Sequence, residues 1–288
     1  RNTIIGGLAG DALTEGNDNV AVGYGALTTE DAHGRNTAVG MNALSSLNAG
    51  DNGNNVAVGY TAGALMTTGL QNTIIGSHAG DALTEGSNNV ALGYQALSTE
   101  DTGGRNIAVG YQALLNQNYN GYAYNVAIGH AAGKEVITGI RNIIIGGLAG
   151  DALTTGNYNT AVGYAALSAE DEHGGNVAVG YNSLASQNAG ADVYNTVVGY
   201  QSGQVISSGE GNTIMGAFAG DALTTGIYNV AIGRSALSTE DAHGYNTAIG
   251  TFALLNQNAG QNAHNVAIGY VAGQNITTGI YNTIVGAN

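Results

Sequence analysis

The sequence predicts an all-β fold, a parallel β-solenoid of 17–19-residue coils with four coils in each 70-residue superrepeat. The pentad Asn-x-x-x-Gly recurs seventeen times, and its intervals repeat as 17, 17, 19 and 17 residues. The first inner residue is always Thr, Val or Ile, the β-branched residues that strands favour. Strands this short become stable only by stacking on their neighbours, about 4.8 Å apart, as the coils of a solenoid do.

The domain organisation follows from the unbroken pattern, which predicts a single continuous solenoid over residues 1–288. The superrepeats are 2–71, 72–141, 142–211 and 212–281, and the start of a fifth lies at 282–288. The absence of Pro fits this fold, since every ladder position needs its N–H. The absence of Trp and the low aromatic content, 6%, predict a thin core of small aliphatic residues.

The Asn of each pentad is predicted to form a ladder from coil to coil. In register, its side-chain amide can bond the next coil, and Asn also tolerates a tight turn. The closing Gly permits a turn that a Cβ would obstruct. The predicted structural Asn ladder consists of Asn2, Asn19, Asn36, Asn55, Asn72, Asn89, Asn106, Asn125, Asn142, Asn159, Asn176, Asn195, Asn212, Asn229, Asn246, Asn265 and Asn282.

A second apolar element follows each pentad and is predicted to form the opposite wall of a narrow core. It reads Ala26-Leu27 and Ala96-Leu97 in two coils, and its counterpart in the coil that begins at Asn55 is Met66. Polar stretches such as TTEDAHG and SLNAGDNGN are expected to be exposed loops.

The middle inner residue of the pentad is Ala in eleven cases, Ile in five and Val in one, while the third is aliphatic or Met. Both faces of each strand are therefore apolar, and a solenoid interior covers only one of them. With the third residue assigned to the core, the middle residues form an exposed stripe that favours self-association. The alternative is that loops of the same chain cover this stripe. The predicted self-association face is Ile4, Ala21, Ala38, Ala57, Ile74, Ile144, Ile214 and Ile284.

The charge and composition exclude several classes of partner. The net charge of −14 argues against nucleic acid and against anionic membrane surfaces. No apolar run approaches the roughly 18 residues that a membrane span needs, so we expect no membrane insertion. The chain has no Cys, which excludes disulfides and Cys-ligated metals. It begins with Arg inside the repeat pattern, and we expect it to be a segment of a longer protein or a processed product.

An acidic loop with a nearby His recurs in three superrepeats, and the second superrepeat has Gly103 in place of the His. Such a cluster could hold a divalent cation such as calcium. A solvated acidic loop that keeps the protein soluble is the preferred interpretation, so we predict no metal site and no cofactor. The candidate ligands would be Glu30, Asp31, His33, Glu170, Asp171, His173, Glu240, Asp241 and His243.

Catalysis is not expected. Glycoside hydrolysis needs two carboxyl groups about 5 to 9 Å apart around a cleft, whereas the paired acids here repeat with the scaffold. The 16 Tyr gather just after the pentad Gly and in loops. We expect them to cap the core edge or pack between chains, and stacking on sugars is the alternative.

The pentads at Asn19, Asn229 and Asn246 resemble the repeated phrase in the head domains of trimeric autotransporter adhesins, and the resemblance spans essentially the whole chain. The stretch GYQAL, at Gly93–Leu97 and Gly110–Leu114, is similar to repeats of phage and environmental fibre proteins. The resemblance implies a left-handed β-roll of three chains around one axis, located at a cell or virion surface. It also implies attachment as the role, without cofactor or catalysis.

These observations predict a structural repeat segment of an extracellular fibre or filament. Its partners would be identical chains, either as a trimer or joined end to end. The alternative is an adhesin or phage fibre module whose loops bind surface glycans or host receptors. The loop Asn118–Asn125 departs from the period and is the best candidate for such binding.

Overall fold

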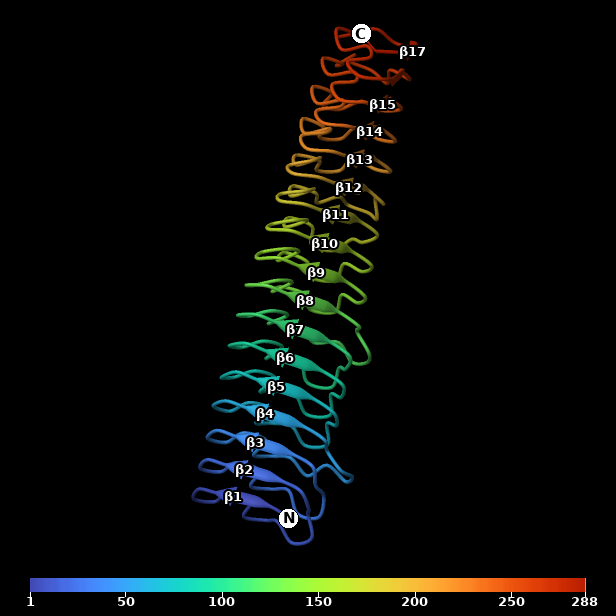
Figure 1. The fold of residues 1–288 in the computed structure, drawn as a ribbon. Helices are drawn as coiled ribbons and strands as arrows, with labels where there is room; N and C mark the ends of the chain where they lie inside the picture. The colour runs from blue at the N-terminus through green and yellow to red at the C-terminus, as the bar shows by residue number, and fades with distance from the viewer. Residues whose placement is uncertain (288) are drawn as a thin grey trace. The chain divides into compact units, whose positions relative to one another are not determined.

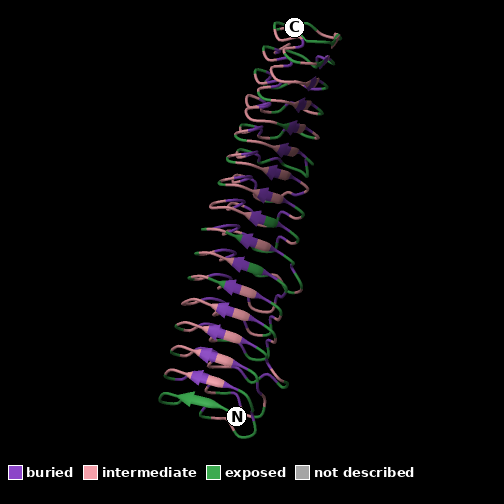
Figure 2. Cartoon of the chain, viewed as in Figure 1, coloured by how far each residue is buried: buried purple, intermediate pink, exposed green. Residues whose placement is uncertain are grey.

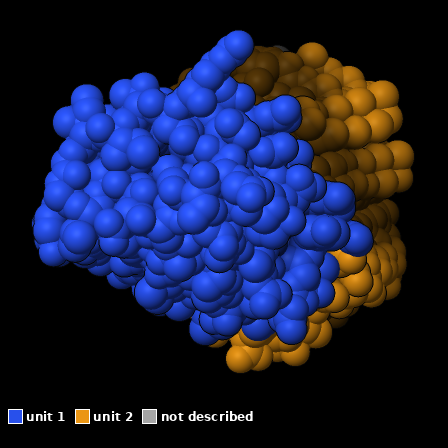
Figure 3. All heavy atoms as spheres, turned by 90° about the horizontal axis from the view of Figure 1, so that it is seen from below, with its two compact units in different colours: residues 1–142 blue, residues 143–288 orange. Residues whose placement is uncertain are grey.

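The computed structural model describes residues 1–287. It divides the chain into two compact units, unit 1 (Arg1–Asn142) and unit 2 (Ile143–Asn288), shown in separate colours in Figure 3. The regular elements in the described part are three-residue β-strands, with no helix among them. The predicted all-β class is confirmed.

Unit 1 is a stack of eight coils with one strand each, as Figure 1 shows. Consecutive strands pair in parallel and in register, so that Ala21 lies beside Ala38, and Ala38 beside Ala57. The strands are β1 (Thr3–Ile5), β2 (Val20–Val22), β3 (Thr37–Val39), β4 (Val56–Val58), β5 (Thr73–Ile75), β6 (Val90–Leu92), β7 (Ile107–Val109) and β8 (Val126–Ile128).

Unit 2 repeats this arrangement with nine strands. Its strands are also parallel and in register, for example Ala161 beside Ala178. They are β9 (Ile143–Ile145), β10 (Thr160–Val162), β11 (Val177–Val179), β12 (Thr196–Val198), β13 (Thr213–Met215), β14 (Val230–Ile232), β15 (Thr247–Ile249), β16 (Val266–Ile268) and β17 (Thr283–Val285). Each unit is thus a parallel β-solenoid, as predicted.

The middle residue of each strand lies in the core, which corrects the predicted self-association face. Ala21, Ala38, Ala57, Ile74, Ile144 and Ile214 have no exposed surface. Ile4 is 44% exposed and Ile284 is half-buried, and they belong to the first and last strands of the described chain. The first and third residues point outward instead, and Figure 2 shows the buried middle of most strands.

The alternation of side chains along each strand explains why the middle residues point inward. Side chains alternate between the two faces of a strand, so the Asn that precedes a strand shares its face with the middle residue. Asn19 and Asn36 are buried, and Ala21 and Ala38 therefore point inward with them. The stripe is covered within one chain, by the opposite wall of each coil.

That opposite wall is built largely from the predicted apolar residues. Leu27, Leu97 and Met66 have no exposed surface, and the equivalent Leu83 of the next coil type is also buried. A Cβ added to Gly80 would lie 2.8 Å from Leu83 and 3.4 Å from Ile74, so the core is a single thin layer between strand and wall. Burying one such Leu stabilises the fold by about 1.5–3 kcal/mol.

The glycine that closes each pentad permits the close stacking of coils. Gly110 has a φ of +138°, a region that side chains disfavour, and its missing Cβ would lie 2.2 Å from the carbonyl oxygen of Gly129. The positive φ and the close approach of the next coil's carbonyl oxygen recur from pentad to pentad. Neighbouring coils therefore approach through bare backbone at this corner.

Candidate functional site

The asparagine ladder lies just inside the start of each strand. In unit 1, the backbone N–H of each pentad Asn from Asn19 onward donates to Oδ1 of the preceding one, at 2.9–3.2 Å. In unit 2 the same bonds recur from Asn176 onward at 2.8–3.2 Å. The ladder therefore links each side-chain oxygen to a backbone amide of the next coil. At Asn55, Asn72, Asn212 and Asn282 the side-chain amide also donates to the preceding Asn, at 3.0–3.3 Å, as the sequence predicted.

In 17-residue coils, the Nδ2 group of the Asn bonds a carbonyl of its own coil, and in some of them it also bonds a Gln of the preceding coil. Asn125 Nδ2 donates to the carbonyl of Gly139 and to Oε1 of Gln117, both at 2.7 Å. In the 19-residue coils this geometry is lost, and Nδ2 of Asn36, Asn106 and Asn246 has no hydrogen-bond partner. The buried Gln was missed by sequence reasoning, because a Gln near the end of a polar stretch gives no signal of burial.

The glutamate of each acidic loop is fully buried, which corrects the prediction of a solvated loop. Glu30, Glu100, Glu170 and Glu240 have no exposed surface. Glu100 Oε1 accepts the Gly103 N–H at 2.8 Å, and its Oε2 accepts the Tyr119 N–H at 3.4 Å. Glu30 and Glu100 therefore satisfy backbone amides of their own coil and of the next one, whereas Glu170 and Glu240 bond the backbone N–H of the His in their own coil.

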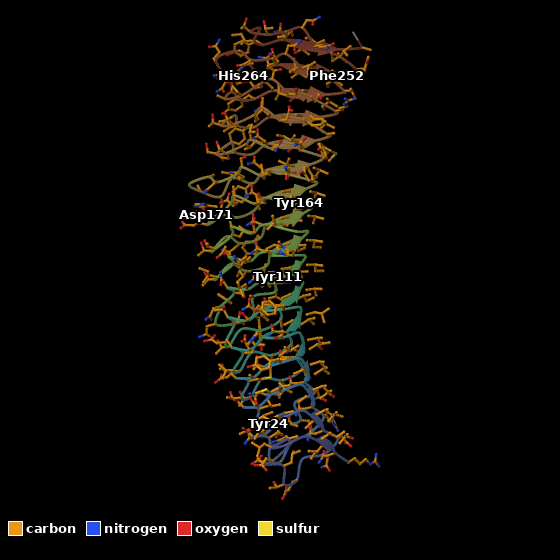
Figure 4. The ribbon with its side chains drawn as sticks, turned by 90° about the vertical axis from the view of Figure 1, so that its left-hand side faces the viewer. Tyr24, Tyr111, Tyr164, Asp171, Phe252 and His264 are labelled. Atoms are coloured by element: carbon orange, nitrogen blue, oxygen red, sulfur yellow. The ribbon has the colours of Figure 1, made fainter. Side chains whose placement is uncertain are left out.

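Burial also changes the acidity of these carboxyls. Desolvation raises the pKa of Glu100 to about 7, against the lowering effect of its two backbone hydrogen bonds. Desolvation likewise raises the pKa of Glu170. The aspartate that follows contacts solvent more, and Figure 4 places Asp171 on the loop side of its coil, away from the strands.

The acidic and histidine side chains do come together in three superrepeats. Each Glu-Asp-His group brings three possible ligand atoms within 4.8 Å of one another. His243 Nδ1 lies 3.1 Å from Glu240 Oε1, and this distance suits a hydrogen bond. In all three groups the same glutamate oxygen already accepts the backbone N–H of the His, at 3.1–3.2 Å. The glutamate's position is therefore explained by the backbone bonds of its loop.

Aromatic side chains after the pentad Gly form stacked columns. The Tyr94 and Tyr111 rings lie 5.5 Å apart at 15°, and the Tyr111 and His130 rings lie 5.1 Å apart at 8°. Tyr164 and Tyr181 stack in the same way in unit 2, and Figure 4 shows the Tyr111 and Tyr164 positions. Such stacking places ring faces against each other, so these rings turn their edges to solvent and offer little face to a sugar.

A second column stands immediately before the pentad Asn. In unit 2 it is aromatic, with the rings of Tyr245 and His264 4.9 Å apart and those of His264 and Tyr281 5.3 Å apart. In unit 1, the Arg105 guanidinium lies 4.0 Å from the centre of the Tyr122 ring and donates to the Tyr124 hydroxyl. The irregular loop Asn118–Asn125 is thus packed onto the coil before it.

Acidic residues recur with the scaffold, and each of the three Glu-Asp-His groups occupies the same place in its own superrepeat.

Nothing in residues 1–287 forms a helix long and apolar enough to cross a lipid bilayer. No protein-family model matches this chain, and no curated protein sequence matches it significantly.

Proposed function

We propose that this chain is a structural repeat segment of an extracellular fibre or filament, which supplies length and stiffness and displays its loops. The observation that carries the proposal is the repetition of the same buried bonds from coil to coil. Each coil adds a strand, an Asn bond and one layer of aliphatic side chains. The stability of such an array is roughly a sum over coils and their contacts, so it can be lengthened without redesign.

The features that recur also count against a unique active centre. The buried glutamates bond backbone amides, and the aromatic columns stack on themselves. Both groups contribute to the scaffold in every superrepeat where they occur. Extracellular placement and attachment are part of the proposal, supported by the resemblance to adhesin heads.

A length series tests the structural role. Chains with two, three and four superrepeats should differ in contour length by a constant increment in electron micrographs, about 19 Å per superrepeat for four coils. Their free energy of unfolding should rise with each added superrepeat until cooperativity saturates. Compact particles whose size does not scale with superrepeat number would contradict the proposal.

The alternative, an adhesin that binds surface glycans, predicts a different result. A glycan array probed with the full chain should show binding that is lost on Tyr122→Ala, since Tyr122 is the 54% exposed ring of the irregular loop. The structural role predicts no glycan signal above that of an unrelated acidic protein. Binding that survives this substitution would place the glycan site elsewhere on the chain.

A further inference from the structure

The outward surface of the sheet is a regular, largely apolar surface in each unit. We define the outer sheet face as the first and third residues of every strand, with the residue before each Asn and the residue after each Gly as its borders. Ile107 and Ile128 are 39% and 38% exposed, although strands above and below cover part of each. Figure 4 shows strand side chains projecting on the side opposite the Asp171 loop.

Charge is distributed unevenly between this face and the rest of the chain. Of the six Lys and Arg, five lie in its borders, and of the 20 Asp and Glu, only Asp18 does. The face therefore carries five cations and one acid, while the remaining surface and loops carry one cation and nineteen acids. The border cations are Arg1, Arg35, Arg105, Arg141 and Arg234. The acidic groups of the chain therefore lie almost entirely outside the outer sheet face.

The area of the face suits a stable interface. In unit 1, eight strands about 4.8 Å apart and seven residues across, at about 3.3 Å each, span about 34 by 20 Å, or about 700 Å². A standard protein–protein interface buries about 800 Å² on each partner. One unit alone therefore offers almost the whole area that a specific complex needs.

We propose that the outer sheet face binds the outer sheet face of a second copy of this chain, with the two chains parallel. Side chains here repeat at the strand spacing within each unit, and a second copy presents rows with the identical repeat. A two-fold axis along the stack would place the border before Asn opposite the border after Gly. In unit 1, this sets the arginine border against the border of Tyr24, Tyr60, Tyr94 and Tyr111, whose hydroxyl groups can accept hydrogen bonds from the guanidinium groups.

This inference rests on the proposed structural function and names the surface through which it would assemble. The test uses the full chain and compares two exposed isoleucines, Ile107 on the outer sheet face and Ile137 (44% exposed) off it. Sedimentation velocity should show a dimer for the parent chain. Ile107→Asp should raise the dimer dissociation constant by about tenfold or more, because it buries a charge in an apolar contact. Ile137→Asp should leave it unchanged.

The orientation is tested by cross-linking, for which a chain without Cys is well suited. Mixed Ile107→Cys and Val109→Cys chains should form a disulfide in the parallel pair, because the first residue of one strand meets the third of its partner. Ile107→Cys linked to itself would overturn the parallel arrangement.

A parent chain that stays monomeric, or an Ile137→Asp chain that dissociates as readily as Ile107→Asp, would overturn the interface. If the length series still scales with superrepeat number in that case, the structural function stands and only this inference fails.

Discussion

The strand side and the loop side of each coil obey different rules. On the strand side, the glycines that close the pentads share a φ between +129° and +145°, and the strands pair residue for residue. On the loop side, coils are 17 or 19 residues long, and a buried Glu is followed by a His in three superrepeats and by Gly103 in the other. Regularity is therefore strictest at the strands and the glycines that close the pentads, and coil length and sequence vary in the loops that follow them.

Replacing a glycine by alanine on the strand side and on the loop side should give the largest difference in stability between the two sides. Gly110→Ala places a Cβ 2.2 Å from a backbone oxygen at a φ of +138°, and we expect a loss of about 4 kcal/mol in the free energy of unfolding. Gly190→Ala, on the loop side, meets nothing within 4 Å and should change it by less than about 0.5 kcal/mol. Urea denaturation followed by circular dichroism measures both, and equal effects would remove the distinction.

Replacing a ladder asparagine and a loop asparagine by alanine should give the next largest difference in stability. Asn125→Ala removes bonds to Gly139 and Gln117 and leaves the Asn142 N–H without its acceptor, so we expect a loss of about 3 kcal/mol. Asn120→Ala, at an exposed loop position, should cost less than about 0.5 kcal/mol. Hydrogen exchange should show faster opening of the coils around β8 only in the first variant. Protection there that does not change would show that the ladder contributes little.

The buried Glu100 should make the loop side sensitive to pH. Its pKa is raised from 4.5 to about 7 in the folded chain, so the folded state holds a proton that the unfolded state has released. Stability should therefore fall as pH rises from about 4.5 to 7 and level off above, by about 3 kcal/mol at most. Glu100→Gln should flatten this part of the stability–pH curve. A slope that persists in the variant would assign it to other groups.

The aromatic column should give the smallest effect. Tyr111→Leu removes stacking with Tyr94 and His130 but keeps an apolar side chain, and we expect a loss of about 1 kcal/mol. Tyr270→Leu, at a 59% exposed ring, serves as the matched control. Thermal unfolding distinguishes the two if Tyr111→Leu lowers the midpoint more. Equal midpoints would mean that the column adds no stability beyond its apolar area.

The interior of the coil was only partly predictable from the sequence. Leu27 follows its pentad Asn19 by 8 residues and Met66 follows Asn55 by 11, each position is again apolar in the next superrepeat (Leu97 and Val136), and their burial was correctly predicted from that recurrence. Glu100 was placed in solvent because an acidic residue beside Asp101 normally lies there. Its burial depends on backbone N–H groups of Gly103 and Tyr119, from two different coils, and no sequence pattern displays such a pairing.

The sequence by itself determined the class of fold, the position of every strand and the register of stacking, because one pentad recurs at nearly constant intervals. Only the tertiary structure decided which strand face is inside. Both faces are apolar, so hydrophobicity cannot choose between them. The choice is made by the Asn, whose Oδ1 must reach the next coil's N–H within the core, and alternation then turns the middle residue inward with it.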